Sequence, residues 1–235
     1  MERWYGFVMC GRYTLTLSPG ELAEAFALDE VPDLSPRYNI APSQPVAAVR
    51  LEGPGRKRRL VLLRWGLVPG WAKDPGVGVR MINARSESAY AKPSFRAAFR
   101  SRRCLIPADG FYEWQKVGGR KRAFHVRRRD RGPMAFAGLW ERWEDPASPG
   151  SVIESCTILT TGANASVSHL HERMPVILDP ADYGPWLAPG PQEVEILREM
   201  LGPFSGPLIA VPVAETVKNP RNEGPDCLVP RAGGD

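Results

Sequence analysis

Hydrophobic and polar residues alternate along much of the chain in short stretches, and turn-forming residues separate these stretches. A period of two is typical of β-strands that bury one face. Residues 52–55, Gly118-Gly119 and Arg131-Gly132 supply turns, so neighbouring strands are expected to pair as antiparallel hairpins. The pattern predicts strands at residues 46–51, 60–65, 104–106, 111–115, 123–129, 134–143, 155–161 and 208–213.

Helical spacing appears in a few short segments. Ser18 is placed to cap a helix whose first position is Pro19, and Glu21 completes a capping box. Residues 95–100 and 191–201 also have helical spacing, and residues 165–171 have room for one or two turns. Glycine and proline, at 23 and 24 of 235 residues, favour many turns and short elements. These patterns predict one α+β domain of mostly antiparallel β-sheet with a few short helices.

The length of 235 residues fits one domain with a substantial core, and 43% hydrophobic residues exclude a chain disordered throughout. No apolar run approaches the roughly 18–20 residues of a membrane span. Residues 1–8 lack the apolar core of a signal peptide, so a cytoplasmic protein without a membrane partner is expected. The cysteines, at positions 10, 104, 156 and 227, are spaced too widely for a disulfide framework or a cysteine-based zinc site.

Charge is unevenly distributed around a net value of +5. Twelve Lys and Arg lie between Arg96 and Arg131, against Asp109, Glu113 and Asp130. Residues 140–200 reverse the balance, with ten acids and three Arg. A concentrated basic segment is typical of a surface that binds a polyanion such as nucleic acid. The alternative is a solvated basic face that the acidic segment offsets.

Cys10 follows Met9 directly, so removal of that methionine from a chain started there would leave an N-terminal cysteine. Its α-amine would have a reference pKa of about 7.7–8.0, against about 10.4 for lysine, and would be partly uncharged at neutral pH. Such an amine forms an imine with an aldehyde, and the neighbouring thiol then closes a five-membered thiazolidine. The alternative is a small buried hydrophobe in a first strand.

Three other polar positions are candidates for chemistry. Asn83 and Arg85 could hold a phosphate or sugar oxygen together, or Arg85 could bond carbonyls in a turn. On an alternating strand Glu113 shares a face with Phe111, where burial would raise its pKa and suit acid–base work. The alternative for Glu113 is a surface carboxylate paired with local cations.

His171 is one of three histidines in the chain, and the side chain suits proton transfer near neutral pH. A structural histidine is the ordinary alternative. His169 and His171 could form a metal pair, but no third ligand is evident, so neither a metal nor a cofactor is expected. Trp65, Trp71 and Trp114 accompany the basic residues, and such aromatic rings suit stacking on unpaired bases, although several of the seven tryptophans should lie in the core.

Seven motifs, in this order along the chain, resemble the SRAP family (SOS response-associated peptidases, also called abasic-site processing proteins). The resemblance extends from residue 9 to about residue 228. The motifs are MCGRY (9–13), RYNIAP (37–42), WGLVPGW (65–71), INARSE (82–87), PADGFYEW (107–114), HERMP (171–175) and VKNPRNEGP (217–225).

The resemblance implies a barrel-like arrangement of β-sheets around a positively charged groove, without a metal. It implies recognition of abasic sites in single-stranded DNA, especially near junctions with duplex, and a covalent DNA–protein cross-link that shields the lesion during the DNA damage response. The catalytic positions of the family fall on Cys10, Asn83, Glu113 and His171. Its DNA-contacting positions fall on Arg12, Arg85, Pro42, Trp71 and Lys218, and we add Trp114 as a stacking candidate.

Residue chemistry and the family pattern together favour one mechanism. His171 would protonate the ring oxygen of the abasic sugar, and Glu113 would move protons during imine formation and hold the Cys10 amine. Asn83 would position the amine or the sugar. The thiol of Cys10 would then close the thiazolidine, and the same acid could reverse the adduct.

Eight residues precede Met9, and as written they block the amine of Cys10. We expect residues 1–8 to be non-native or removed, residues 9–228 to form the SRAP domain and residues 229–235 to be a tail. Self-removal would require thiol peptidase activity, which a Cys–His pair can support, and such a peptidase is one alternative function. A non-covalent module for single-stranded DNA is another. Nothing in the sequence requires more than a monomer.

Overall fold

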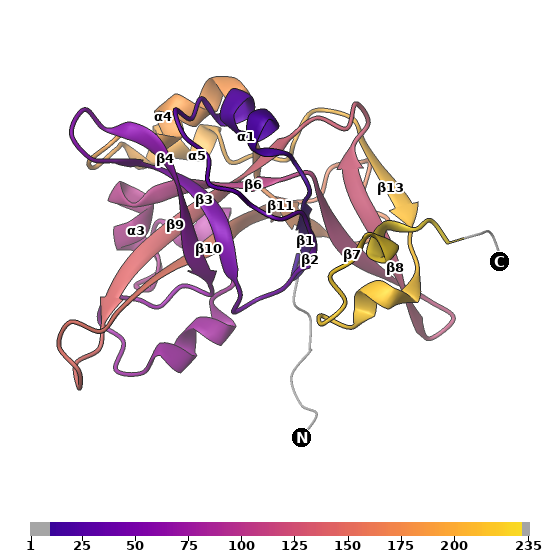
Figure 1. Cartoon of the computed structure of the whole chain (residues 1–235), viewed down its shortest axis with the longest axis horizontal. Helices are drawn as coiled ribbons and strands as arrows, with labels where there is room; N and C mark the ends of the chain where they lie inside the picture. The colour runs from indigo at the N-terminus through magenta and orange to yellow at the C-terminus, as the bar shows by residue number, and fades with distance from the viewer. Residues whose placement is uncertain (1–9, 232–235) are drawn as a thin grey trace.

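Two β-sheets that meet along one side organise residues 10–231, the part of the chain that the computed structural model describes (Figure 1). The expected N-terminal extension, residues 1–8, and the last four residues of the expected tail lie outside this range. The smaller sheet has five strands in the order β13 (Leu208–Pro212), β8 (Arg120–Arg128), β7 (Gly110–Val117), β1 (Tyr13–Leu15) and β2 (Arg37–Ile40).

The larger sheet closes on itself. Its order is β11 (Arg173–Pro175), β10 (Val152–Gly162), β4 (Lys57–Trp65), β3 (Pro45–Glu52), β6 (Arg103–Ala108), β9 (Met134–Glu144) and β12 (Ile177–Leu178). Strand β10 pairs with both β4 and β9, so β3, β4, β6, β9 and β10 form a barrel. β5 (Asn83–Arg85) joins β10 in parallel. The predicted α+β class with mostly antiparallel, barrel-like sheet is confirmed, and the parallel pairings of β10 are the exceptions.

Two of the three predicted hairpins form, at residues 52–55 and at Gly118-Gly119. The prediction at Arg131-Gly132 is wrong, because this turn joins β8 of the small sheet to β9 of the large sheet. Gly118 and Gly119 join β7 to β8 with φ angles of 56° and 78°, a conformation that glycine adopts without steric cost. The segment between β9 and β10 is also a hairpin loop, in which Asp145 N–H donates to Ser151 O. Strands β1, β2, β5, β11 and β12 were not among the predicted ranges. They have two to four residues each, too few to show a period.

The helices are short. In α1 (Pro19–Phe26) the Ser18–Glu21 capping box forms as predicted. Helix α3 (Arg96–Ser101) is offset by one residue from its predicted segment, and α5 (Val194–Glu199) occupies the middle of the predicted segment 191–201, whereas residues 165–170 form turns. The other helices are α2 (Ser86–Ala89), α4 (Tyr183–Leu187), η1 (Pro75–Arg80), η2 (Pro180–Asp182), η3 (Glu215–Lys218) and η4 (Pro225–Leu228). Within the described residues no helix has the length and apolar character needed to cross a bilayer.

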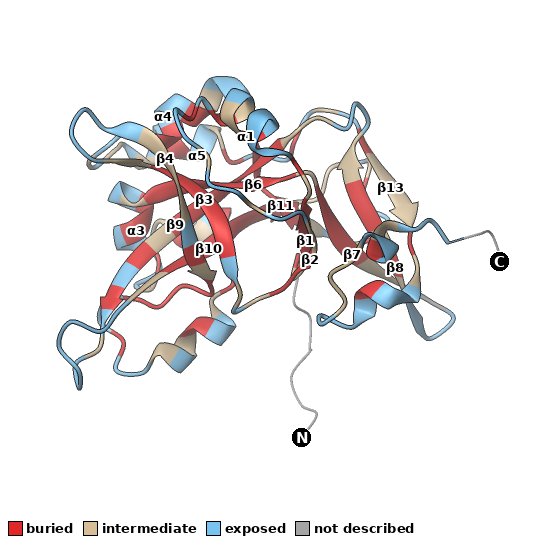
Figure 2. Ribbon diagram, viewed as in Figure 1, coloured by how far each residue is buried: buried red, intermediate tan, exposed pale blue. Residues whose placement is uncertain are grey.

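Buried strands run through both sheets and meet at β1 (Figure 2). The ring of Tyr13 on β1 packs edge-on against Trp65 of the barrel at 5.4 Å and against Phe136 at 5.8 Å between centroids. A second cluster, built on Tyr112, Val217 and Cys227, lies where the C-terminal segment covers the other face of the small sheet. All four cysteines are buried and unpaired.

The basic segment of residues 96–131 does not form one surface. Helix α3 lies beside the barrel, whereas β7 and β8 lie at the other end of the molecule (Figure 1). Arg102 pairs with Glu141 at 2.6 Å, and the buried Arg103 donates to carbonyls of Trp186 and Phe99. Arg128 pairs with Asp130. Part of the segment therefore serves the fold, and its cations do not lie on one face of the molecule.

Candidate functional site

Cys10 lies immediately before β1, with 1% of its surface exposed. β1 and β7 are antiparallel with Tyr13 opposite Phe111, and Tyr112 N–H donates to Arg12 O, so the ladder continues toward the start of the described chain. This register places Cys10 beside Glu113. The backbone N–H of Cys10 donates to Glu113 Oε1 at 3.1 Å. The nitrogen that would become an α-amine therefore contacts a carboxylate already.

Glu113 is 4% exposed and shares its face of β7 with Phe111, as the alternation predicted. Burial raises the pKa of Glu113 to about 7, and backbone hydrogen bonds from Cys10 and Trp114 only partly oppose this rise. A carboxyl group with this pKa gives and takes protons readily at neutral pH.

The Cys10 thiol is a poor thiolate in this setting. Burial raises its pKa well above the ordinary value, and the nearby charge of Glu113 raises it further. Catalytic peptidase thiols usually have a lowered pKa, so the site favours a thiol that loses its proton to a base during the reaction.

Asn83 approaches from the barrel. It is the first residue of β5, and β5 is held parallel to β10 with Asn83 opposite Ile158. Its Nδ2 lies 3.5 Å from Cys10 O. The structure thus brings Cys10, Glu113 and Asn83 together from segments far apart in the sequence.

His171 lies on the loop before β11. Its Nδ1 accepts the backbone N–H of Arg173 at 3.0 Å, so the neutral ring carries its proton on Nε2. Arg173 is bonded to both carboxylate oxygens of Glu87 at 2.6 and 2.9 Å, and Gln115 on β7 donates to His169 O at 3.1 Å. The described residues contain no hydrogen bond from His171 to Cys10 or Glu113, so His171 borders their cluster rather than joining it.

The predicted phosphate-contacting cations differ in how firmly they are held. Arg12 Nη1 donates to Asn39 Oδ1 at 2.7 Å and to Val217 O at 3.1 Å. Lys218 is exposed and pairs with Glu215 within η3. Arg85 is exposed at the end of β5, two residues from Asn83.

The aromatic candidates differ clearly in how far they are exposed. Trp65 is fully buried and donates from Nε1 to Ile82 O, so it belongs to the core. Trp71 is 64% exposed. Trp114 is half-buried against the second cluster, and Pro42 is half-buried just after β2. Trp71 is therefore the aromatic ring best presented to a ligand.

The loop that carries Trp71 is well anchored. Trp143 Nε1 donates to Ala72 O at 2.7 Å, and Ser155 Oγ accepts from Val68 N–H at 2.8 Å. Gly66 and Gly78 touch so closely that a Cβ on Gly78 would lie 2.5 Å from Gly66 O. The ring is thus exposed on a fixed support.

Several residues of the site surroundings carried no chemical signal of their own in the sequence. Asn39 and Glu223 anchor the C-terminal segment to β2, and Gln115 and Glu87 hold the loop of His171. Motif membership pointed to Asn39, Glu223 and Glu87, whereas nothing pointed to Gln115. Among the described residues no group of three or more His, Cys, Asp or Glu is arranged to hold a metal ion.

The structure defines a protein of two joined β-sheets with a buried Cys–Glu pair where they meet. The family model for "SOS response associated peptidase (SRAP)" matches residues 9–220, and the chain belongs to this family.

The chain is 39% identical over 225 residues to "Abasic site processing protein YoqW" of Bacillus subtilis (strain 168), covering 94% of this chain and 99% of that protein. It is 30% identical over 271 residues to "Abasic site processing protein HMCES" of Mus musculus, covering 94% and 76%. A solved Bacteroides thetaiotaomicron structure has the same fold, with a TM-score of 0.84 at 22% identity, covering 95% of this chain and all of that one. A Bordetella bronchiseptica structure matches with a TM-score of 0.74 at 28% identity, covering 87% and 100%.

Proposed function

We propose that this protein processes abasic sites in single-stranded DNA by joining them to Cys10 as a thiazolidine. Relatives that share nearly the whole chain are named abasic site processing proteins. The observation that carries the proposal is the 3.1 Å contact between the Cys10 nitrogen and Glu113, a buried carboxyl group with a pKa of about 7.

The chemistry balances without a cofactor. The amine of Cys10 adds to the aldehyde carbon of the opened sugar, and the resulting carbinolamine loses water to give an imine. The thiol then adds to the imine carbon, and its proton goes to the nitrogen. One C–N bond and one C–S bond form, and one water leaves. Glu113 takes the proton from the attacking amine and returns it to the departing hydroxyl.

His171 and Asn83 assist the reaction of Cys10 and Glu113. The Nε2 proton of His171 serves the ring oxygen of the closed sugar, because sugar opening requires an acid there. Asn83 holds the Cys10 carbonyl from the barrel side. Glu113 in its protonated form is the acid for slow reversal of the adduct.

The DNA path follows the fixed and exposed groups around the site. Arg12, Arg85 and Lys218 contact phosphates, and Trp71 and Trp114 stack on bases while Pro42 lines the strand. A junction with duplex fits the exposed Trp71 as a wedge. The proposed unit is a monomer acting in the cytoplasm on nucleoid DNA.

The mechanism requires a Cys10 with a free α-amine, so the active chain begins there. Start at Met9 followed by removal of that methionine supplies this terminus, and self-cleavage by the site supplies it as well. Peptidase activity is the second candidate, and the Cys10–Glu113–Asn83 cluster beside the preceding peptide bond is what favours it.

The decisive measurement is the intact mass of the purified protein, alone and with an oligonucleotide containing one abasic site. We expect a chain beginning at Cys10 that gains the oligonucleotide mass minus water. Cys10→Ser should retain the amine, lose the stable adduct and yield a cross-link only after borohydride reduction of the imine. A wild-type chain that begins at Cys10 and gains no mass would refute the proposal.

The same samples separate the alternatives. Removal of residues 1–9 from wild type but not from Cys10→Ala would establish self-cleavage. Equal binding of intact and abasic strands, with no adduct and a steep salt dependence, would leave only a non-covalent DNA-binding module.

A further inference from the structure

The β7–β8 hairpin carries a cluster of positive charge at its tip. No acidic residue occurs between Trp114 and Arg129. The tip holds Lys116, Arg120, Lys121 and Arg122 within seven residues of chain. Lys116 and Lys121 lie directly opposite each other across the two strands. The tip thus concentrates positive charge at the end of two paired strands, and such a concentration attracts anions.

Basic residues of the β3–β4 hairpin, in contrast, form ion pairs. On the β3–β4 hairpin, Lys57 pairs with Asp29 at 2.7 Å and Arg59 with Glu30 at 3.1 Å. In the β7–β8 hairpin, Arg120 and Lys121 are exposed, and neither forms an ion pair with any described residue. The two hairpins lie on opposite sides of the molecule (Figure 1).

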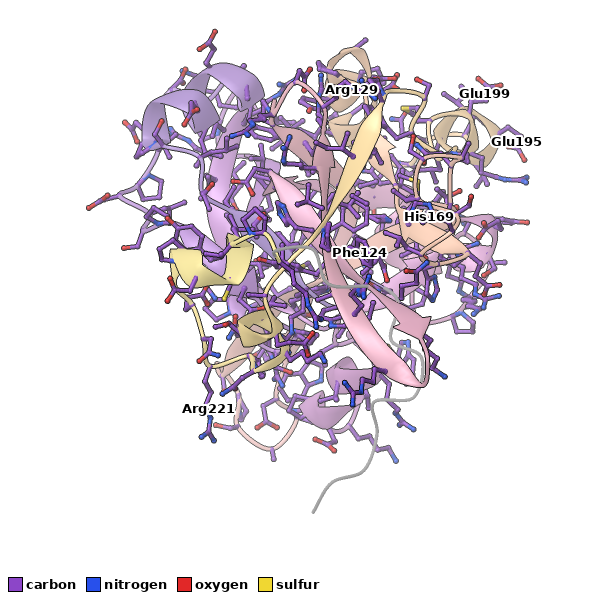
Figure 3. All side chains as sticks on the ribbon, turned by 90° about the vertical axis from the view of Figure 1, so that its right-hand side faces the viewer. Phe124, Arg129, His169, Glu195, Glu199 and Arg221 are labelled. Carbon is purple, nitrogen blue, oxygen red and sulfur yellow. The ribbon has the colours of Figure 1, made fainter. Side chains whose placement is uncertain are left out.

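The charged tip is tied directly to the proposed reaction centre. Strand β7 contains Glu113, and Gln115 on the same strand donates to His169 O, on the loop that carries His171. His169 and the hairpin residue Phe124 are visible on the same side of the molecule (Figure 3). In the antiparallel register Arg122 opposes Gln115 and Arg120 opposes the next residue on that face, so both arginines share the face of Glu113.

The hairpin also has the stiffness and length that a docking arm needs. Its Gly118-Gly119 turn fixes the two strands in register as far as the tip. At about 3.4 Å per residue, the end of β7 lies about 14 Å beyond Glu113. A stacked strand presents a phosphate about every 3.4 Å, so this reach corresponds to about four nucleotides from the reacting sugar.

We propose that the tip of the β7–β8 hairpin is a phosphate-binding site for the DNA strand on one side of the abasic residue. This proposal rests on the proposed function, because it takes the reacting sugar to lie at Cys10 and Glu113. Arg120 and Lys121 bind backbone phosphates about four nucleotides away and hold the strand without reading its sequence.

The test compares two double variants that each remove two positive charges from a hairpin. Arg120→Ala/Lys121→Ala removes the proposed contacts, and Lys57→Ala/Arg59→Ala removes the ion-paired cations of β3–β4 as the matched control. Affinity for an abasic single strand would be measured across a salt series, with the adduct blocked by Cys10→Ala in every protein. Two lost contacts should lower the salt slope by about 1.4 and the affinity by about 25-fold at about 0.1 M salt. The control should keep the wild-type slope.

A flank-length series locates the contact. For proteins with Cys10 intact, strands would be shortened separately on the two sides of the abasic residue. Wild type should lose affinity when one particular side falls below about four nucleotides, and Arg120→Ala/Lys121→Ala should show no such step. At saturating DNA the control variant Lys57→Ala/Arg59→Ala should cross-link at the wild-type rate.

The outcomes separate this proposal from the function on which it rests. If wild type cross-links and Arg120→Ala/Lys121→Ala keeps its salt slope and length step, the hairpin proposal is wrong while the function stands. Equal losses in both double variants would also overturn it, since that result reflects net charge alone. If wild type neither binds nor cross-links abasic DNA, the function itself fails.

Discussion

At the scale of single residues, the burial of Glu113 favours its proposed chemistry but lowers the stability of the fold. The carboxyl is almost fully buried, and within residues 10–231 its donors are the backbone N–H groups of Cys10 and Trp114. Those donors do not compensate for desolvation, so the pKa rises to about 7. The same burial that suits proton transfer at neutral pH makes the ionised form costly to the folded chain.

This cost predicts an unusual effect of Glu113→Gln on stability. The pKa of Glu113 is raised from 4.5 to about 7 in the folded state. Its ionisation therefore has no effect on stability below about pH 4.5, costs stability increasingly between pH 4.5 and about 7, and has its full cost above that. At pH 8 Glu113→Gln should therefore unfold at a higher urea concentration than wild type. Its free energy of unfolding should be larger by about 3 kcal/mol at most, and the difference should vanish near pH 4. Glu144→Gln, at an exposed carboxylate of β9, should not stabilise at either pH.

The stabilised variant should be a poor cross-linker. Glutamine keeps an acceptor for the Cys10 nitrogen but transfers no proton, so the cross-linking rate should fall by about 10²–10⁴ while affinity for abasic DNA persists. A Glu113→Gln protein with equal stability gain at pH 4 and pH 8 would show that its effect does not come from ionisation.

At the scale of elements, the C-terminal segment of residues 213–231 is bonded to β2, an edge strand of the small sheet. Asn39 is its hub, because Nδ2 donates to the carbonyls of Val217, Asn219 and Asn222 at 2.9–3.1 Å while Oδ1 accepts from Arg12. Glu223 accepts the backbone N–H groups of residues 38 and 39. The segment thus fixes the guanidinium that we propose for phosphate binding.

Removal of this hub should affect folding and binding together. Asn39→Ala removes the donor shared by three carbonyls and one of the acceptors of Arg12, and should cost about 3 kcal/mol of unfolding free energy in urea. Asn39→Asp keeps an acceptor for Arg12 but sets a carboxylate against three carbonyls, so it should not restore stability. Affinity for single-stranded DNA should drop in Asn39→Ala, and by no further amount in Arg12→Ala/Asn39→Ala. Additive losses would show that Asn39 does not act through Arg12.

What the sequence predicts at this scale depends on the length of the pattern. The long alternating strands and the capped helix were predicted because a period needs several residues to appear, and β2, β5, β11 and β12 are too short for one. Motifs nominated the site residues, and alternation correctly buried Glu113. The contact of Cys10 with Glu113, 103 residues apart, depends on how β1 pairs with β7, and no local pattern encodes that pairing. The split of the basic segment between two ends of the molecule was missed for the same reason.

At the scale of the whole molecule, the candidate site lies across the boundary of the two sheets. Cys10 and Glu113 come from the small sheet, whereas Asn83 and the loop of His171 come from the barrel side. Their geometry depends on how firmly the sheets are joined. Tyr13 is central to that joint through its edge contacts with Trp65 and Phe136.

Tyr13 and Tyr112 form a matched pair that tests the joint. Tyr13 Oη is buried and has no hydrogen-bond partner among residues 10–231, whereas Tyr112 Oη donates to Tyr38 O at 2.7 Å. Tyr13→Phe should therefore raise the unfolding free energy by about 1 kcal/mol with cross-linking intact, because an unsatisfied buried hydroxyl is lost. Tyr112→Phe should lower it by about 1 kcal/mol.

Tyr13→Ala removes the ring itself and should cost about 3–5 kcal/mol of unfolding free energy. In this variant cross-linking should fall even under conditions where the chain stays folded. If Tyr13→Ala cross-links normally while folded, the sheets are aligned by other contacts. If Tyr13→Phe destabilises, the hydroxyl has a partner such as a bound water.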